Sequence, residues 1–215
     1  MTSGFYSIQR GVLDARSLRG LVDGICRSEY LGKSPLGEEF VNTRGFSVVF
    51  KREAIDEVKD RFPYLEPYLE AVVFDGSNAF YVNPLVLNES SKVSPHIDCR
   101  LLSPQNIRLI PNLVSVFYAQ VSAEMKGGRL VLNVGSDNEV TVKPKTNEVV
   151  HFLGKVIHSV TEVTNPRKRV SVVCEQYNLE DDVLEVFPYF QLVCDRDFAP
   201  RVAIGRGVPS SIADA

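Results

Sequence analysis

The stretch GGRLVLNVGSDNEVTVKPKTNEVVHFLGKVIHSV, residues 127–160, decides the fold class of this chain. Short runs rich in valine alternate in it with turn segments such as GSDN and KPKTN. Branched side chains favour extended backbone, whereas Gly, Pro, Asn and Asp favour turns. The stretch therefore predicts several short strands joined by tight turns, which is typical of a sandwich or a barrel.

The same pattern continues on both sides of this stretch. Each predicted strand is short, rich in valine and bounded by turn residues. We expect these strands to form a mainly β core over about residues 76–195. The predicted strands cover residues 79–88, 113–121, 128–134, 139–144, 148–154, 156–164 and 169–179.

The first part of the chain has a different character. Residues 13–30 place apolar side chains at helical spacing, and residues 52–74 indicate a second helix that Pro63 and Pro67 interrupt. One short strand is predicted between them, at residues 46–50. We therefore expect a helical layer over about residues 1–75, ahead of the β core.

The composition bounds the class of protein. The chain has 215 residues, of which 44% are hydrophobic and 24% charged, and this suits a single domain over residues 1–215. The net charge of −3 offers no basic field that would attract nucleic acid or an anionic membrane. No apolar run approaches the ~20 residues of a membrane span, and no secretory signal is visible, so we expect a cytoplasmic protein. The four cysteines include no CxxC pair and are expected to be free thiols, and nothing indicates an oligomeric state.

The segment SPHIDC, residues 94–99, carries a candidate metal motif. In an extended segment the side chains of His96 and Asp98 lie on the same side, so both can reach one metal ion. The alternative is that they are two polar residues of a loop. A stable site needs a third ligand, and the remaining histidines are His151 and His158.

Strand parity favours His158 as the third ligand. His158 shares a strand face with Val156 and Val160, and an apolar face normally points inward. His151 lies opposite Val150 and Phe152, which predicts an outward position or one at a pocket rim. Two imidazoles and one carboxylate leave coordination positions open, which is typical of non-haem Fe(II) oxygenases.

The next strand contributes an arginine to the same inner face. Arg169 shares its face with Ser171 and Val173, and it follows His158 by a short interval. An inward guanidinium needs an anion, because a buried unpaired charge is costly. A dicarboxylate held by a bidentate pair would meet that need. Arg167 is the rival candidate for this role.

These motifs together resemble a known family. HID at 96–98, HSV at 158–160 and RVS at 169–171 follow the order and spacing of the Fe(II)- and 2-oxoglutarate-dependent dioxygenases, in particular the prolyl 4-hydroxylase-like branch. VSVFYAQVSAEMKGGRLVL at 114–132 and VKPKTNEVVHF at 142–152 also resemble segments of that family. The match is good over about residues 80–180 and loose over about residues 10–75.

The resemblance implies a fold and a set of iron ligands. The family fold is a double-stranded β-helix, that is, a jelly roll of the cupin kind, with the N-terminal helices packed on one sheet. His96, Asp98 and His158 would be the iron ligands. The implied cofactors are Fe(II), 2-oxoglutarate as co-substrate and O2, with ascorbate as an optional addition.

The resemblance also implies co-substrate contacts. Arg169 would bind the distal carboxylate of 2-oxoglutarate, and Tyr118 matches a tyrosine that often bonds to the same carboxylate. Asn88 stands near a position that some members use around the co-substrate. Val173 replaces a threonine of some relatives, and Ser171 is the substitute hydroxyl. For Tyr118 the alternative is an ordinary core tyrosine, and for Asn88 it is a turn residue.

The implied activity is hydroxylation of a C–H bond with release of succinate and CO2. The expected substrate is a prolyl or similar residue of a protein or peptide. The first alternative is the same chemistry on a small molecule such as a free amino acid. The second is a non-catalytic jelly-roll binding protein. Residues 99–111 form a candidate lid over the site, and the acidic segment LEDD at 179–182 is predicted to be a solvated strand end.

Overall fold

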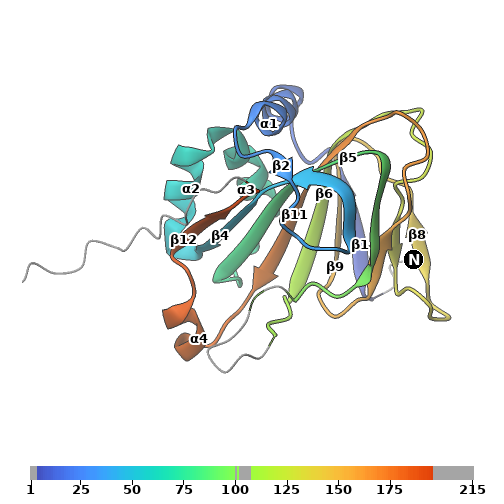
Figure 1. The fold of residues 1–215 in the computed structure, drawn as a ribbon. Coiled ribbons are helices and arrows are strands. Elements are labelled where there is room, and N and C mark those ends of the chain that lie inside the picture. Colours follow the sequence, from blue (N-terminus) through green and yellow to red (C-terminus); the bar gives the residue numbers. More distant parts are fainter. Residues whose placement is uncertain (1–3, 100, 102–107, 196–215) are drawn as a thin grey trace, which may run out of the picture.

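The computed structural model describes residues 4–99, 101 and 108–195, and in these residues twelve strands form one curled antiparallel sheet (Figure 1). Eight strands follow one another across the sheet, and the other four extend it beside β5. The main path runs β1 (Tyr6–Arg10), β9 (Glu148–Leu153), β6 (Leu113–Val121), β11 (Arg169–Tyr177), β5 (Ala79–His96), β10 (His158–Val160), β7 (Leu130–Leu132) and β8 (Val140–Val142).

The four additional strands lie on the other edge of β5. Strands β3 (Phe40–Gly45) and β4 (Ser47–Lys51) both pair with β5. Strand β2 (Gly32–Lys33) pairs with β3, and β12 (Phe190–Val193) pairs with β4. The predicted strand at 46–50 corresponds to β4.

Strand β5 connects the two walls of the curled sheet. Its first half, from Ala79 to Leu87, pairs with β11, whereas Val93 and His96 pair with β10. Between these halves the backbone is irregular, and Ser90 adopts a left-handed conformation with φ 63°. The bend lets one strand continue from one wall to the other, and it brings His96 opposite His158.

The helices cover the outer face of one wall (Figure 1). They are α1 (Ala15–Arg27), α2 (Ile55–Arg61) and α3 (Glu66–Val72), with 3-10 turns at Arg52–Ala54 and Pro63–Leu65. Their apolar side chains share one core with outward-facing strand residues such as Val82, Phe117 and Val172. The predicted packing of N-terminal helices on one sheet is therefore confirmed.

Local sequence explains where these helices begin and end. The Asp14 carboxylate accepts hydrogen bonds from the backbone N–H groups of Arg16 and Ser17, which otherwise lack partners at the start of α1. The second predicted helix is divided at Phe62, because Pro63 cannot donate to the preceding turn. Pro67 lies in the first turn of α3, where a missing N–H costs little.

Two details differ from the sequence-based expectation. The N-terminal 75 residues contain more strands than the one predicted at 46–50, because β1, β2 and β3 also join the sheet. The prediction of a strand end at 179–182 is wrong, because Asp181 begins the short helix α4 (Asp181–Val186) after Glu180 at the N-cap. Acidic side chains are favourable at a helix N-terminus, where the backbone N–H groups carry partial positive charge.

None of the described helices is long and apolar enough to cross a membrane. Most of the candidate lid, residues 100 and 102–107, lies outside the described residues, so the structure does not test that prediction.

Candidate metal centre

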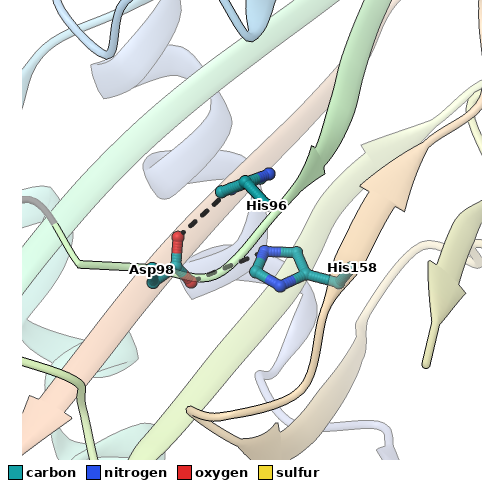
Figure 2. A group of neighbouring side chains, drawn as sticks. All are labelled: His96, Asp98 and His158. Atoms are coloured by element: carbon teal, nitrogen blue, oxygen red, sulfur yellow. Dashed lines mark ion pairs between the residues drawn. The ribbon is translucent and has the colours of Figure 1, made fainter. Parts of the chain in front are cut away.

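His96, Asp98 and His158 converge at one point of the curled sheet (Figure 2). His96 ends β5, Asp98 follows it, and His158 begins β10 directly opposite His96. The Asp98 carboxylate lies between the two rings, with Oδ1 3.3 Å from Nε2 of His96 and Oδ2 3.5 Å from Nε2 of His158. One ligand atom from each residue lies within 4.8 Å of the other two.

Both rings are oriented by backbone carbonyls. Nδ1 of His96 lies 2.8 Å from the carbonyl oxygen of Ser94, and Nδ1 of His158 lies 3.1 Å from that of Val156. Because a carbonyl only accepts, each Nδ1 carries the proton, and the neutral ring turns the Nε2 lone pair toward Asp98. Burial lowers the pKa of His158, which favours this neutral, metal-binding form.

The third histidine lies elsewhere. The imidazole of His151 hydrogen-bonds the hydroxyl of Ser115, with Nδ1 and Oγ 2.8 Å apart, and its ring meets the edge of Phe74 with centroids 5.5 Å apart. His151 faces away from the metal group, as parity predicts. The ring thus points outward from the inner face, but it is not exposed to solvent, because the residue is only 9% exposed and its ring packs against Phe74.

A single cavity extends from this group to Arg169. Eight polar and eight apolar side chains line this cavity. The polar lining comprises Asn83, His96, Asp98, Tyr118, His158, Arg169, Ser171 and Glu175. The apolar lining comprises Leu36, Phe40, Leu85, Val93, Val116, Leu130, Val160 and Val173.

The Arg169 end of the cavity is prepared for an anion. Arg169 is 3% exposed, and among the described residues it makes no ion pair. Its Nη1 donates to the carbonyl of Gly128 at 2.5 Å, and the guanidinium lies 5.2 Å from the centroid of the Tyr118 ring.

Three buried polar atoms at this end have no hydrogen-bond partner in the described part of the chain. They are Nε of Arg169, the hydroxyl of Tyr118 and Oγ of Ser171. Each such atom costs about 1–3 kcal/mol if it stays unsatisfied. Burial raises the pKa of Tyr118 to about 12, so its hydroxyl stays protonated and can donate. A carboxylate would satisfy all three donors, so the residues present fit a dicarboxylate co-substrate.

Two other predicted candidates lie away from the cavity. Arg167 is exposed and pairs with Glu124. Asn88 is also exposed and is not among the lining residues, because it lies where β5 becomes irregular and its backbone N–H bonds to Ser91. The expectation that Asn88 contacts the co-substrate is therefore corrected.

Glu175 lines the cavity and did not figure in the sequence prediction. The signal was present, because Glu175 has the same parity on its strand as Arg169, Ser171 and Val173. Strand parity predicted the inner face at the start of β11. The same alternation, followed to the end of β11, also predicts that Glu175 lies on this face.

Neither the scan against protein-family models nor the search of curated proteins gave a match. Solved structures with a similar fold include a prolyl-4-hydroxylase from Pseudomonas putida, with 18% identity over 83% of this chain and 95% of that chain, and a TM-score of 0.57. A 2OG-Fe(II) oxygenase family protein from Burkholderia pseudomallei has 12% identity over 82% of this chain and 87% of its own, with a TM-score of 0.56.

A third similar structure is a prolyl hydroxylase from Trichoplax adhaerens in complex with a hypoxia inducible factor peptide. It has 12% identity over 82% of this chain and 84% of that chain, with a TM-score of 0.53. The fold is that of the 2OG-Fe(II) oxygenases. The predicted jelly roll is thereby confirmed, and the oxygenase fold accounts for the curled sheet with helices on one wall. At these identities the likeness concerns the fold, and the chemistry rests on the site.

Proposed function

We propose that this chain is an Fe(II)- and 2-oxoglutarate-dependent dioxygenase that hydroxylates a C–H bond and releases succinate and CO2. The observation that carries the proposal is the single cavity that joins a His-Asp-His group to a buried arginine with unsatisfied donors around it. A metal group alone would serve other oxygenases, and a buried arginine alone would serve any anion. Together the metal group and the arginine fit a keto acid whose keto-acid end binds the metal and whose distal carboxylate binds Arg169. We propose that residues 1–215 act as one domain.

In this proposal His96, Asp98 and His158 hold the iron. Two imidazoles and one carboxylate suit Fe(II) and leave positions open on the metal. Iron held there would supply the redox chemistry of oxidative decarboxylation, with open positions for the co-substrate and O2. The protein holds both rings by their Nδ1–H groups, so the Nε2 atoms are fixed before the metal arrives.

Arg169, Tyr118 and Ser171 bind the distal carboxylate of 2-oxoglutarate. Ser171 lies opposite Tyr118 across β11 and β6, so both hydroxyls reach the same level of the cavity as the guanidinium. The planar guanidinium can donate two parallel bonds to one carboxylate. This arrangement sets the orientation of the co-substrate, with its keto-acid end toward the metal group.

The substrate approaches from an outer groove that adjoins the metal group. The groove is lined by residues on both sides of the HID motif, namely Glu39, Pro95, His96, Ile97, Asp98, Cys99, Arg108 and Ile157. The similar prolyl hydroxylase in complex with a peptide supports a protein or peptide substrate. A prolyl residue is the first case to test, and a small molecule such as a free amino acid is the alternative.

The experiment is an anaerobic titration of the protein with Fe(II) and 2-oxoglutarate. Formation of the visible metal-to-keto-acid charge-transfer band is expected, followed by succinate when O2 is admitted. A protein that binds Fe(II) but never forms the band is no 2-oxoglutarate enzyme. One that forms the band and makes no succinate with any substrate is the non-catalytic alternative.

A further inference from the structure

A second hollow of the molecule is separate from the cavity that joins the metal group to Arg169. It has a volume of about 540 Å3, which lies within the roughly 300–1,000 Å3 of small-ligand sites. Within the described part of the chain, the two share no lining residue. Four of the residues that line the second hollow are cations, namely Lys126, Arg129, Lys143 and Lys145. We call this feature the basic hollow.

The four cations of the basic hollow have no counter-charge of their own. All four are exposed, and none makes an ion pair with another described residue. Two acids lie nearby, but neither belongs to the described lining, because Glu124 pairs with Arg167 and Glu162 approaches through its backbone carbonyl. Like charges repel one another, and in a chain of net charge −3 this group is a local exception. A bound anion would reduce that repulsion.

The two walls of the basic hollow come from two loops that are tied together. One pair of cations lies between β6 and β7, and the other pair lies between β8 and β9. Leu130 of β7 pairs with Val142 of β8 where the loops meet the sheet. The N–H of Val121 donates to Oγ1 of Thr146 at 2.9 Å, and that hydroxyl donates to the Val121 carbonyl at 3.2 Å. The two walls are therefore held at a fixed separation.

Hydrogen bonds also fix the backbone of the loop between β6 and β7. The N–H of Lys126 donates to Oδ1 of Asn165 at 2.9 Å, and the N–H of Arg129 donates to Oγ1 of Thr161 at 3.0 Å. Gly127 between them has φ 76°, and a side chain there would lie 1.7 Å from a backbone carbonyl oxygen of the segment after β10. The loop is thus in place before a ligand arrives, which lowers the entropic cost of binding.

The chemistry of the lining selects a compact anion with more than one negative charge. A phosphate monoester carries about 1.5–2 negative charges at neutral pH and has three acceptor oxygens. A guanidinium can donate two parallel hydrogen bonds to a phosphate, and lysines add point charges around it. A single carboxylate carries one charge and two oxygens, so it would use only part of the lining. An extended acidic protein segment is the alternative, but a hollow with cations on two walls suits a compact group better.

We propose that the basic hollow binds a phosphate group, either the free ion or the phosphate of a small molecule. This is a second ligand site, and it does not depend on the iron site or on the proposed function. The site shares a loop with the co-substrate end of the other cavity, because the carbonyl of Gly128 accepts the hydrogen bond from Arg169.

The test measures binding by calorimetry to the full chain prepared without metal, so that phosphate cannot bind through iron. The probes are inorganic phosphate, glycerol 3-phosphate, acetate and a blocked peptide of five glutamates. The first two distinguish the free ion from a phosphate ester. Acetate is the singly charged control, and the glutamate peptide represents the acidic protein segment.

We expect phosphate or its ester to bind about 10-fold more tightly than acetate, as one additional charge-assisted hydrogen bond would give. The double variant Lys143→Gln/Lys145→Gln removes the charge of one wall and should weaken phosphate binding by about 10-fold. Lys126→Gln/Arg129→Gln removes the charge of the other wall and should have a similar effect. Two independent variants guard against a local change of structure in either loop.

The matched control is Lys92→Gln/Lys155→Gln. It removes the same charge from two exposed lysines that lie outside the hollow, and phosphate affinity should stay within about twofold of that of the unmodified protein. Thermal unfolding shows whether each variant keeps its fold, so that lost affinity is not confused with lost structure.

Four outcomes overturn the inference. Phosphate and its ester do not bind at millimolar concentration, or acetate binds as tightly as they do. The hollow variants bind phosphate as the unmodified protein does, which would place the phosphate elsewhere, for instance at Arg169. The control variant loses as much affinity as the hollow variants, which would show an effect of net charge alone. The glutamate peptide binds tightly and phosphate does not, which would assign the hollow to an acidic protein segment.

Discussion

The polar groups at the two ends of the cavity differ in whether they have hydrogen-bond partners. At the metal end the polar groups hold one another, because both imidazoles bond to backbone carbonyls, Asp98 lies between the rings, and Tyr177 donates to Glu175. At the other end Arg169, Tyr118 and Ser171 each keep a buried polar atom without a partner in the described chain. One end is preorganised by its own contacts, whereas the donors at the other end would be satisfied by the proposed ligand.

The contrast between the two ends explains how the fold would orient a dicarboxylate. The end with Arg169 is suited to a carboxylate, whereas the end with Asp98 is suited to a metal cation. In the proposed function, a keto acid would therefore bind in one orientation only.

The largest effect is expected at the metal end. His96→Ala or His158→Ala removes one of three proposed ligands, and Fe(II) binding and turnover should fall below detection. His151→Ala is the matched control, because that ring lies on the other side of the sheet. Anaerobic iron binding measures the outcome. Iron retained by His158→Ala and lost by His151→Ala would reverse the assignment.

A smaller effect is expected from Tyr118→Phe at the Arg169 end. The change removes one neutral hydrogen bond to the co-substrate, so 2-oxoglutarate affinity should fall about 2- to 10-fold, while Fe(II) affinity stays the same. Tyr68→Phe is the control, because Tyr68 is an equally buried tyrosine that packs among the helices. Equal losses in both variants would mean that Tyr118 is an ordinary core tyrosine.

The smallest effect is expected from Ser171→Ala. The serine hydroxyl is a weaker contributor beside a guanidinium, and its removal also relieves a buried atom without a partner. Affinity for 2-oxoglutarate should fall about twofold, and the free protein should be unchanged or slightly more stable. Thermal unfolding with and without 2-oxoglutarate separates these two effects. Loss of stability in the free protein would show that Ser171 supports the fold.

Much of this site could be predicted from local sequence. The parity of β11 places Arg169 and Ser171 inside and Val170 and Val172 against the helices, as alternation requires. The parity of β10 likewise brings His158 to the inner face. These predictions succeed because strand alternation is a local property of the backbone.

Other features could not be read in this way, because they depend on distant contacts. Strand β1 is mostly exposed and is held by β9, so Arg10 meets Glu148 across 138 residues. His151 is buried by Phe74, a residue from the end of the helical layer. Asn88 lies beside a backbone irregularity, where the rule of alternation fails. Tertiary packing decides each of these cases.

The role of Arg169 is tested by titrating the anaerobic Fe(II)-loaded Arg169→Ala protein with 2-oxoglutarate and measuring the visible charge-transfer band. The bidentate pair contributes roughly 1.5–3 kcal/mol, so affinity should fall about 10- to 100-fold with Fe(II) affinity nearly unchanged. Arg169→Lys should recover part of the loss, because it restores the charge without the planar fork. Arg167→Ala should bind as the unmodified protein does, since Arg167 is exposed and pairs with Glu124. An Arg169→Ala protein with unchanged 2-oxoglutarate affinity would contradict the account.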